Sequence, residues 1–474
     1  MEISGSEEVD SSNKAEFNYS TGKFLSYSSA WFMDSFFLTY FGQVVVYYYE
    51  KVILLNILWL TVAYAIFSLW NAFNDPLLAY FTEKPRSWSK KYGLRTLWII
   101  AAAFLGSIMF SLIFFPPSID AVTNPLPIFI YFVVVVCIYD SFYTIFNSNY
   151  TGASVTIFKT DQQRRKIAGS ALIFSTLGAF TATALVIPTF IEKNNPSSYS
   201  FAAIIVLIIL LANSIAIIPG MKEPEIITNR YIITHKKVKK EDTSFKKVLK
   251  VALKKKNFLM YLIAYLLFSI AINLNQNSSL YFITDVLRED VSINMIAQLG
   301  FILGFLIFMP VWLKIAKKIG HARTFGIGYI LLGIAYLPFM WAATVMEYII
   351  YYTIGGIFYA CSASILVAII ADTYDEIAVE LRRHQEATLQ GITNFFFRFS
   401  YLIAIGIIAF IHIFTGFDPT APYQVGDAAI GVRIHTGLIG GIFCIIAGIS
   451  FLLVYDMKGN KKKMIRVKIK EIEK

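Results

Sequence analysis

Asp75 is the side chain of this 474-residue sequence whose type and setting best fit chemistry inside a membrane. It lies in a long apolar stretch with two amides, Asn71 and Asn74, and a short basic loop follows from Glu83. On a helix, positions 71, 74 and 75 share one face, about 12 Å inside the end of the stretch. A carboxylate at that depth is costly unless a proton, a cation or a basic partner neutralises it, which predicts a functional role.

An alternative stays open, because a polar cluster near a helix end can also bond to its own backbone beside Pro76. Three further ionisable residues interrupt apolar stretches: Asp34, Asp140 and Arg398. Acids in the first half and a base in the second predict a polar central cavity, since charges inside a membrane usually line solute or ion pathways. Asp140 and Arg398 could instead form a purely structural link between helices. His412 and His435, near the outer ends of the last two stretches, are assigned no chemistry.

The composition identifies a membrane protein. Apolar residues make up 57% of the chain and charged residues only 15%, and apolar stretches of about 18 or more residues recur. Helices are the expected spanning element, because each satisfies its own backbone polar groups in lipid. The three cysteines lie singly in apolar stretches, which indicates neither a disulfide framework nor a metal site. The sequence carries no Gly-x-Ser-x-Gly elbow and no phosphate-binding loop, so we expect no enzyme, metal or cofactor.

Twelve apolar segments are predicted to span the membrane, in two sets of six. The first set is about 24–49, 52–81, 94–115, 126–158, 167–191 and 200–220. The second set is about 257–283, 291–313, 324–345, 347–371, 388–414 and 433–456. The segment 126–158 is longer than one span needs, so it is expected to project beyond the bilayer or to break near Gly152.

These segments divide the chain into five parts. They are a disordered tail (1–22), an N-terminal six-helix half (23–220), a basic linker (221–256), a C-terminal six-helix half (257–456) and a basic tail (457–474). With both termini placed inside, 37 of the 42 Lys and Arg residues fall on the cytoplasmic side and four outside. The positive-inside rule therefore predicts cytoplasmic termini. Because the basic residues are spread over alternate loops, the net charge of +11 does not indicate nucleic-acid binding.

Two six-helix halves joined by a basic linker are the organisation of the major facilitator superfamily. At Asn71-Ala-Phe-Asn-Asp-Pro-Leu-Leu-Ala-Tyr80, followed by Arg86-Ser-Trp-Ser-Lys-Lys-Tyr-Gly93, the sequence resembles the glycoside–pentoside–hexuronide:cation symporters, the melibiose-permease group of that superfamily. The segments 371–376 and 310–320 are similar to that family's loops 10–11 and 8–9, and the likeness spans nearly the whole chain.

The resemblance implies transport of a small solute driven by a cation. In that family an Asp-x-x-Asn-Asp cluster on helix 2 holds the coupling cation; Asn74 and Asp75 match its last two members, and Asn71 stands where the first Asp is expected. The loss of one carboxylate favours H⁺ relative to Na⁺, because a single buried Asp can still carry a proton. Asp34 matches the family's helix-1 acid, and Arg398 stands near its helix-11 Lys. Ile173 or a neighbour stands where the family has a sugar-binding Arg, which argues against a galactoside.

We therefore predict a secondary active transporter that couples H⁺ or Na⁺ to the symport of a small polar solute (a sugar, glycoside or hexuronate) by alternating access. The predicted cation-binding residues are Asp75, Asn74, Asn71 and Asp34. The predicted solute-binding residues are Asp34, Asp140, Tyr143, Asn147 and Arg398. The predicted gating residues of the cytoplasmic loops are Glu83, Arg86, Lys318, Asp372 and Arg383.

The expected partners are the solute, a monovalent cation or proton, and the lipid bilayer, for a monomer in the plasma membrane. Two alternatives stay open. One is a lipid or lysolipid transporter or scramblase, which a lateral apolar opening beside Arg398 would favour. The other is a sensor on the same fold that transports nothing, which a sealed cavity would indicate.

Overall fold

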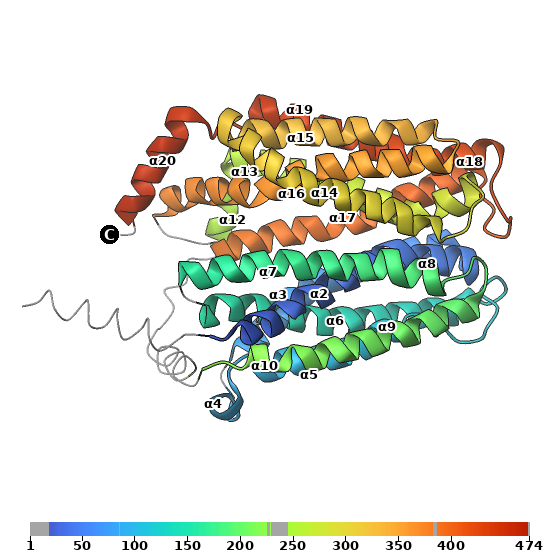
Figure 1. Cartoon of the computed structure of the whole chain (residues 1–474), viewed down its shortest axis with the longest axis horizontal. Coiled ribbons are helices and arrows are strands. Elements are labelled where there is room, and N and C mark those ends of the chain that lie inside the picture. The colour runs from blue at the N-terminus through green and yellow to red at the C-terminus, as the bar shows by residue number, and fades with distance from the viewer. Residues whose placement is uncertain are drawn as a thin grey trace, which may run out of the picture.

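The computed structural model describes residues 19–84, 86–158, 160–224, 228, 245–382 and 386–472. Within these ranges long helices run side by side along one direction (Figure 1). Ten of the helices described there are long and apolar enough to cross a membrane by length and composition. Many large apolar side chains lie on the outside of the bundle, as expected where helices face lipid.

The first half, as we call the helices before residue 222, begins with a helix whose N-cap, Ser20, accepts a hydrogen bond from the amide of Lys23. Its helices are α2 (Thr21–Tyr47), α3 (Ile57–Glu83), α4 (Ser89–Tyr92), α5 (Thr96–Leu112), α6 (Pro125–Ile157), α7 (Asp161–Phe180), α8 (Ile187–Phe190), α9 (Pro196–Ala216) and α10 (Ile218–Met221). Two π-helical turns continue α2 and α7: η1 (Tyr48–Val52) and η2 (Thr181–Val186).

The second half comprises the helices after residue 244. They are α12 (Phe245–Lys254), α13 (Lys256–Tyr281), α14 (Ile293–Ile319), α15 (His321–Tyr336), α16 (Val345–Leu381), α17 (Glu386–Thr415), α18 (Gly426–Arg433), α19 (Ile439–Val454) and α20 (Gly459–Ile472). Three further turns join them: the π-helical η3 (Phe282–Val286) and η5 (Ile434–Leu438), and the 3₁₀ turn η4 (Leu337–Met340).

A helix lies at each of the twelve predicted segments. For the segment 126–158 the structure excludes a break near Gly152, because α6 runs without interruption to Ile157. One prediction about the extent of a segment is wrong. α16 passes through the predicted loop at 371–376 and ends at Leu381. The acids of that stretch have basic partners on α20, with Lys461 at 2.7 Å from Glu376 and Lys462 bound to Asp372. Because these charges are paired, the helix extends beyond its apolar segment.

The two halves form two layers that face each other (Figure 1). Between the layers α2 packs against α13, α3 against α17, and α7 with η2 against α14. We call the end of the bundle that carries α4, α10, α12 and α20 the terminal end, and the end that carries α8 and α18 the distal end (Figure 1). Most of the predicted tail 1–22 and much of the predicted linker 221–256 fall outside the described residues.

The distal ends of α2 and α13 have the same construction. Each helix passes into a π turn, and the second residue after it has a left-handed backbone: φ is 62° at both Leu54 and Arg288. The amide of Leu55 bonds to the carbonyl of Tyr49 at 2.9 Å, and the amide of Glu289 bonds to that of Ile283 at 3.0 Å. The two halves therefore share an internal repeat at this end, as many transporter folds do.

Candidate functional site

An ion pair between Arg398 and Asp75 joins the two halves inside the bundle. Nη2 of Arg398, on α17, lies 3.0 Å from Oδ2 of Asp75, on α3. The other guanidinium nitrogen, Nη1, lies 4.0 Å from Oδ1 of Asp140, on α6. One base from the second half therefore faces two acids from the first, and its shorter contact is with Asp75.

Hydrogen bonds hold both carboxylates in place. The hydroxyl of Thr144 donates to Oδ1 of Asp75 at 2.6 Å, and the amide of Asn74 donates to Oδ2 of Asp140 at 3.1 Å. Asp140 is buried, with 2% of its side chain exposed, whereas 29% of the Asp75 side chain is exposed. Asp75 is therefore the more accessible acid of the pair.

Asn71 adds a spare oxygen to this cluster. Its Nδ2 donates to the carbonyl of Phe67 at 3.2 Å, and its side chain lies within hydrogen-bonding reach of Asp140. Among the described residues no group donates to its buried Oδ1. An unpaired buried amide oxygen is costly, and it is also the kind of ligand that a hard cation takes.

Asp34, on α2, has different partners from Asp75. Tyr143 and Asn147 of α6 both donate to its Oδ1, at 2.9 and 2.7 Å. α6 thus carries Asp140 and also supplies hydrogen-bond donors to Asp34 and Asp75 from the next turn of the same helix. The three predicted acids come from α2, α3 and α6, and side chains of α6 hold the first two in place by hydrogen bonds.

A small cavity adjoins the charged cluster. Its volume is about 30 Å³, and its walls are Phe37, Leu38, Phe41, Phe67, Tyr139, Asp140, Tyr143, Arg398 and Tyr401. That is room for about one water molecule or a monovalent cation, not for a sugar. Within the described ranges, no group of three or more His, Cys, Asp or Glu side chains is placed to hold a metal ion.

A second cavity, of about 250 Å³, lies between the halves and has neutral walls. The first half contributes Ser35, Thr39, Gln43, Leu172, Ser175, Thr176, Ala179 and Thr183. The second half contributes Ile272, Asn275, Gln276, Gln298, Phe301, Ile302, Phe305, Tyr336, Tyr352 and Tyr359. Amides, hydroxyls and aromatic rings can hydrogen-bond and stack on an uncharged solute. Among the described residues nothing accepts from the buried Nδ2 of Asn275, which leaves a donor aimed at no protein group.

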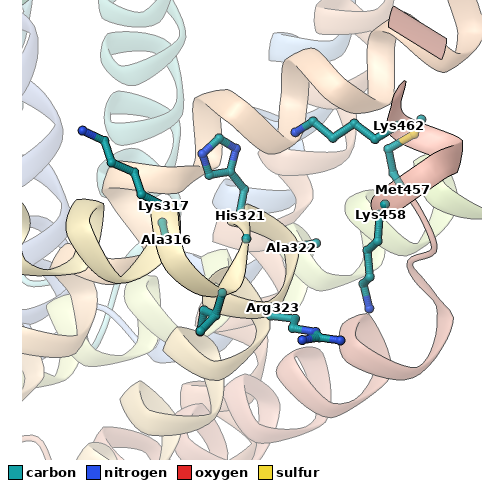
Figure 2. A pocket seen from close by; sticks show the side chains of 11 residues that line it. Ala316, Lys317, His321, Ala322, Arg323, Met457, Lys458 and Lys462 are labelled. Carbon is teal, nitrogen blue, oxygen red and sulfur yellow. The ribbon is translucent and has the colours of Figure 1, made fainter. Parts of the chain in front are cut away.

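A third cavity, of about 420 Å³, lies at the terminal end between the α14–α15 corner and the start of α20 (Figure 2). Its basic lining residues are Lys317, His321, Arg323, Lys458 and Lys462. Their side chains point in different directions and do not converge on one point (Figure 2). It also lies wholly within the second half, away from the interface at which alternating access would take place.

The predicted residues divide between these places. Asp140, Tyr143 and Arg398 line the small cavity, and none of the residues predicted to bind solute lines the 250 Å³ cavity. Four amides that line the 250 Å³ cavity were not among the predicted residues: Gln43, Asn275, Gln276 and Gln298. A run of amides within the predicted segment 257–283 was the available signal: Asn273, Asn275, Gln276 and Asn277.

Two of the predicted gating residues have partners within their own half. The Arg86 guanidinium lies 4.4 Å from the centre of the Phe81 ring, and Asp372 pairs with Lys462. Lys318 is exposed near the end of α14, Glu83 is the last residue of α3, and Arg383 lies outside the described residues. The ion pairs described at the terminal end join residues of the second half to one another: Lys255–Glu380, Lys256–Asp456, Lys461–Glu376, Lys461–Asp456 and Lys462–Asp372.

Strong contacts between the halves lie at the distal end. Lys51 of the first half pairs with Asp285 of the second at 2.7 Å and donates to the carbonyl of Ala421 at 2.8 Å. Lys193 of the first half donates to the carbonyl of Thr284 at 2.9 Å and to that of Pro422. The halves are therefore bound together at the distal end, beyond the 250 Å³ cavity.

Residues 26–458, nearly the whole described chain, match the MFS/sugar transport protein family. The chain belongs to this family. It is 24% identical to the lactose permease of Leuconostoc lactis over 438 residues, which cover 88% of this chain and 64% of the permease. It is 19% identical to the sodium-dependent lysophosphatidylcholine symporter 1 of Xenopus tropicalis over 435 residues, which cover 83% of this chain and 79% of that protein. The chain thus spans less than two thirds of the length of the lactose permease.

Solved structures show the same fold. A crystal structure of the nucleoside transporter NupG matches with a TM-score of 0.62 at 12% identity, covering 92% of this chain and 99% of that one. The peptide transporter POT matches with a TM-score of 0.58 at 14% identity, covering 92% and 95%. Together with the family match, these structures confirm the predicted relationship and the all-helical major facilitator fold. The protein is a multi-pass member of a family of membrane transporters.

Proposed function

We propose that the protein is a symporter in which a monovalent cation or a proton, bound at Asp75, drives the transport of a small neutral solute rich in hydroxyl groups. The ion pair between Arg398 and Asp75 is the observation that carries this proposal, because it joins the acid of the cation site to the other half of the molecule. A change in the charge of Asp75 therefore changes a contact between the halves.

Competition for Asp75 supplies the coupling. In the structure Arg398 neutralises this carboxylate. A cation held by Asp75, Asp140 and the spare oxygen of Asn71 would neutralise it instead, as would a proton on Asp75. Either event weakens the bond between α3 and α17, so the halves become free to move only when the cation site is occupied.

The neutral walls and the volume of the 250 Å³ cavity support the proposed solute. About 250 Å³ is smaller than the roughly 300–1,000 Å³ of pockets for drug-sized ligands, and it suits one sugar unit. Since none of its lining residues is basic, the cavity favours a neutral sugar over a hexuronate. With the distal end placed outside the plasma membrane, as the positive-inside rule predicts, this cavity would open next toward the cytoplasm.

A second candidate is a lysolipid transporter. The relative from Xenopus tropicalis is by name a lysophosphatidylcholine symporter, and its match covers 83% of this chain. Acyl chains need an apolar path longer than the 250 Å³ cavity provides in this conformation, so this candidate requires a larger opening than the structure contains.

Thermal unfolding of the purified full-length protein tests both candidates. Neutral sugars, hexuronates and lysophosphatidylcholine are each added at two pH values, with and without Na⁺. A ligand at 100 times its Kd stabilises the folded protein by about 2.7 kcal/mol. We expect a neutral sugar to stabilise it, more strongly with Na⁺ or at the lower pH.

Asp75→Asn should abolish this cation dependence, whereas Asp427→Asn, the same change at an exposed acid of α18, should preserve it. In vesicles Asp75→Asn should lose solute accumulation but keep some downhill exchange. Stabilisation by lysophosphatidylcholine alone would favour the second candidate. An undiminished cation effect in Asp75→Asn would overturn the proposed cation site.

A further inference from the structure

Three titratable side chains are buried together at the distal end, apart from the cluster at Asp75. Glu50 comes from η1 in the first half, His412 from α17 and His435 from η5 in the second half. Only 3% of Glu50, 3% of His412 and 0% of His435 is exposed. The symport mechanism proposed above uses none of them.

The three side chains form one continuous line of hydrogen bonds. The Tyr281 hydroxyl donates to Oε2 of Glu50 at 2.6 Å, and Nδ1 of His412 lies 2.9 Å from Oε1 of the same carboxylate. Nε2 of His412 lies 3.2 Å from Nε2 of His435, whose Nδ1 lies 2.6 Å from the hydroxyl of Ser278. Each ring nitrogen of both histidines thus has one partner.

With Glu50 ionised, counting protons along this line allows two arrangements. An ionised carboxylate only accepts, so Nδ1 of His412 must carry a proton. In the first arrangement His412 is neutral, Nε2–H of His435 donates to it, and Ser278 donates to Nδ1 of His435. In the second, His412 carries protons on both nitrogens and donates to Nε2 of His435, whose Nδ1–H then donates to Ser278. Both arrangements satisfy every nitrogen, and they differ by one proton.

The surrounding charges favour the arrangement with the extra proton. A buried carboxylate needs a cation beside it. The ammonium of Lys51, the next residue after Glu50, is bound to Asp285 and to the carbonyl of Ala421. Imidazolium on His412 is the cation whose hydrogen bond reaches Glu50.

Other titratable groups on the elements packed around the cluster have their own partners. Lys193 donates to two backbone carbonyls, and Arg433 donates to the carbonyls of Met340 and Ala342. Asp418 accepts from Thr420, and Tyr47 bonds to Thr284.

We propose that Glu50, His412 and His435 form a proton-binding site that is complete only when the distal ends of the two halves are together. Closure brings Glu50 of the first half against His412 of the second, and the site takes up one proton. Separation exposes the carboxylate and both imidazoles to water, and the proton is released. Above the ordinary pKa of histidine, about 6.5, both separated imidazoles are neutral and the closed form binds one more proton, so a fall in pH toward that value favours closure, by up to about tenfold in the closed-to-open ratio per pH unit. Below about pH 6.5 both separated imidazoles become protonated while the closed site still holds one added proton, so a further fall in pH favours separation.

This site is independent of the proposed cation site at Asp75 and of the identity of the solute. It can therefore be tested without any ligand, by measuring the distance between spin labels on the two halves. Val122 and Val425 are exposed at the distal end, one in each half, and each is replaced by cysteine. Cys137 is replaced by serine, and the buried Cys361 and Cys444 are kept. The full-length protein is measured in lipid nanodiscs between about pH 5 and pH 8, the range in which histidine titrates.

We expect the population with the shorter label distance to grow as the pH falls from 8 to about 6.5, and to grow no further below it. Glu50→Gln and His412→Gln should each remove most of this growth, because neither variant can form the carboxylate–imidazolium pair. His321→Gln, the same change in a histidine at the terminal end, should retain it. His435→Gln should retain part of it, since His412 can still pair with Glu50.

Two results would overturn the proposal. One is a label distance that does not change with pH in the unaltered protein. The other is a pH response that Glu50→Gln and His412→Gln leave intact. If one of these variants fails to elute as a folded monodisperse protein, the other decides.

Discussion

Lys51 and Asp285 hold the same position in the two halves of the chain, 234 residues apart, and they bind each other at 2.7 Å. Each lies in the π turn that ends the first long helix of its half. Tyr47 and Tyr281, which have the same separation, also meet, with their ring centres 4.9 Å apart. Residues that a repeat makes equivalent come into contact only near the axis that relates the repeats. That axis therefore passes through the distal end, between α2 and α13.

The equivalence of these positions leads to a first prediction, for the buried ion pair. Asp285→Asn leaves the fully buried ammonium of Lys51 without its carboxylate, which should destabilise the protein by about 3–5 kcal/mol. Exchanging the two residues, with Lys51→Asp and Asp285→Lys in one chain, should restore most of that loss, because both positions have the same backbone. Thermal unfolding in detergent gives the comparison. An exchanged variant as unstable as Asp285→Asn would contradict the equivalence.

The second prediction concerns Arg398 as a competitor of the cation. Arg398→Gln removes the group that neutralises Asp75 in the structure. Affinity for Na⁺ or H⁺ should therefore rise by about tenfold or more, or ~1.4 kcal/mol, while solute accumulation is lost. The increase in melting temperature with added Na⁺, and with falling pH, measures this affinity in the absence of solute. Arg323→Gln, at the terminal end, serves as the control, and equal cation responses in both variants would disprove the competition.

The third prediction places the solute in the 250 Å³ cavity. Gln276→Leu and Gln298→Leu each remove a neutral hydrogen-bonding group from its wall. A polar solute group left unpaired costs about 1–3 kcal/mol, so the Kd should rise roughly 5- to 150-fold. Titration of the sugar identified by thermal unfolding gives the Kd. Gln390→Leu, in which the amide bonds to Asn394 and Tyr374 away from this cavity, should bind normally. If all three variants bind alike, the solute lies elsewhere.

The fourth prediction concerns the close contact between α14 and α16. A Cβ atom on Gly356 would overlap the carbonyl oxygen of Phe301, so Gly356→Ala forces these helices apart. We expect a loss of about 1–3 kcal/mol in the free energy of unfolding. Gly406→Ala is the matched control, because a Cβ there meets nothing within 4 Å and alanine favours the helix. Equal melting temperatures for the two variants would show that the helices can separate without cost.

The positions of the spanning helices could be predicted because apolar length alone determines which stretches can cross a membrane. The end of α16 could not be predicted in this way. Its continuation past 371 depends on Lys461 and Lys462, which lie about ninety residues further on and reach it only in the folded chain.

The candidate site was predictable in its residue types but not in its pairing. Asp75, Asp140 and Arg398 stand out because charge is rare in apolar stretches. Whether Arg398 meets Asp75 or Asp140 depends on the rotation of α3, α6 and α17 about their axes, which hydropathy does not report. The structure contains both contacts, and the one with Asp75 is the shorter, at 3.0 Å against 4.0 Å for Asp140.

Glu50, His412 and His435 were the hardest to recognise. Each lies near the end of an apolar segment, where polar side chains normally face water or lipid headgroups. Their burial depends on the segment after α17 folding back, so that Phe417 stacks on the His412 ring with centres 3.9 Å apart. No pattern within a single segment contains that information.

Lys461 and Lys462 also fix α20 to α16, and Lys461 bonds to Asp456 at 2.6 Å. Although partial burial opposes the charged form, Lys256, Lys461 and Asn257 hold the pKa of Asp456 below its usual range. The contribution of Asp456 to this attachment is therefore present at neutral pH. It is lost only when the pH falls below the ordinary pKa of aspartate. A fluorescent protein fused after Ile472 would consequently turn with the second half as a rigid body. Energy transfer from it to a dye on α4 would follow the opening of the terminal end in living cells.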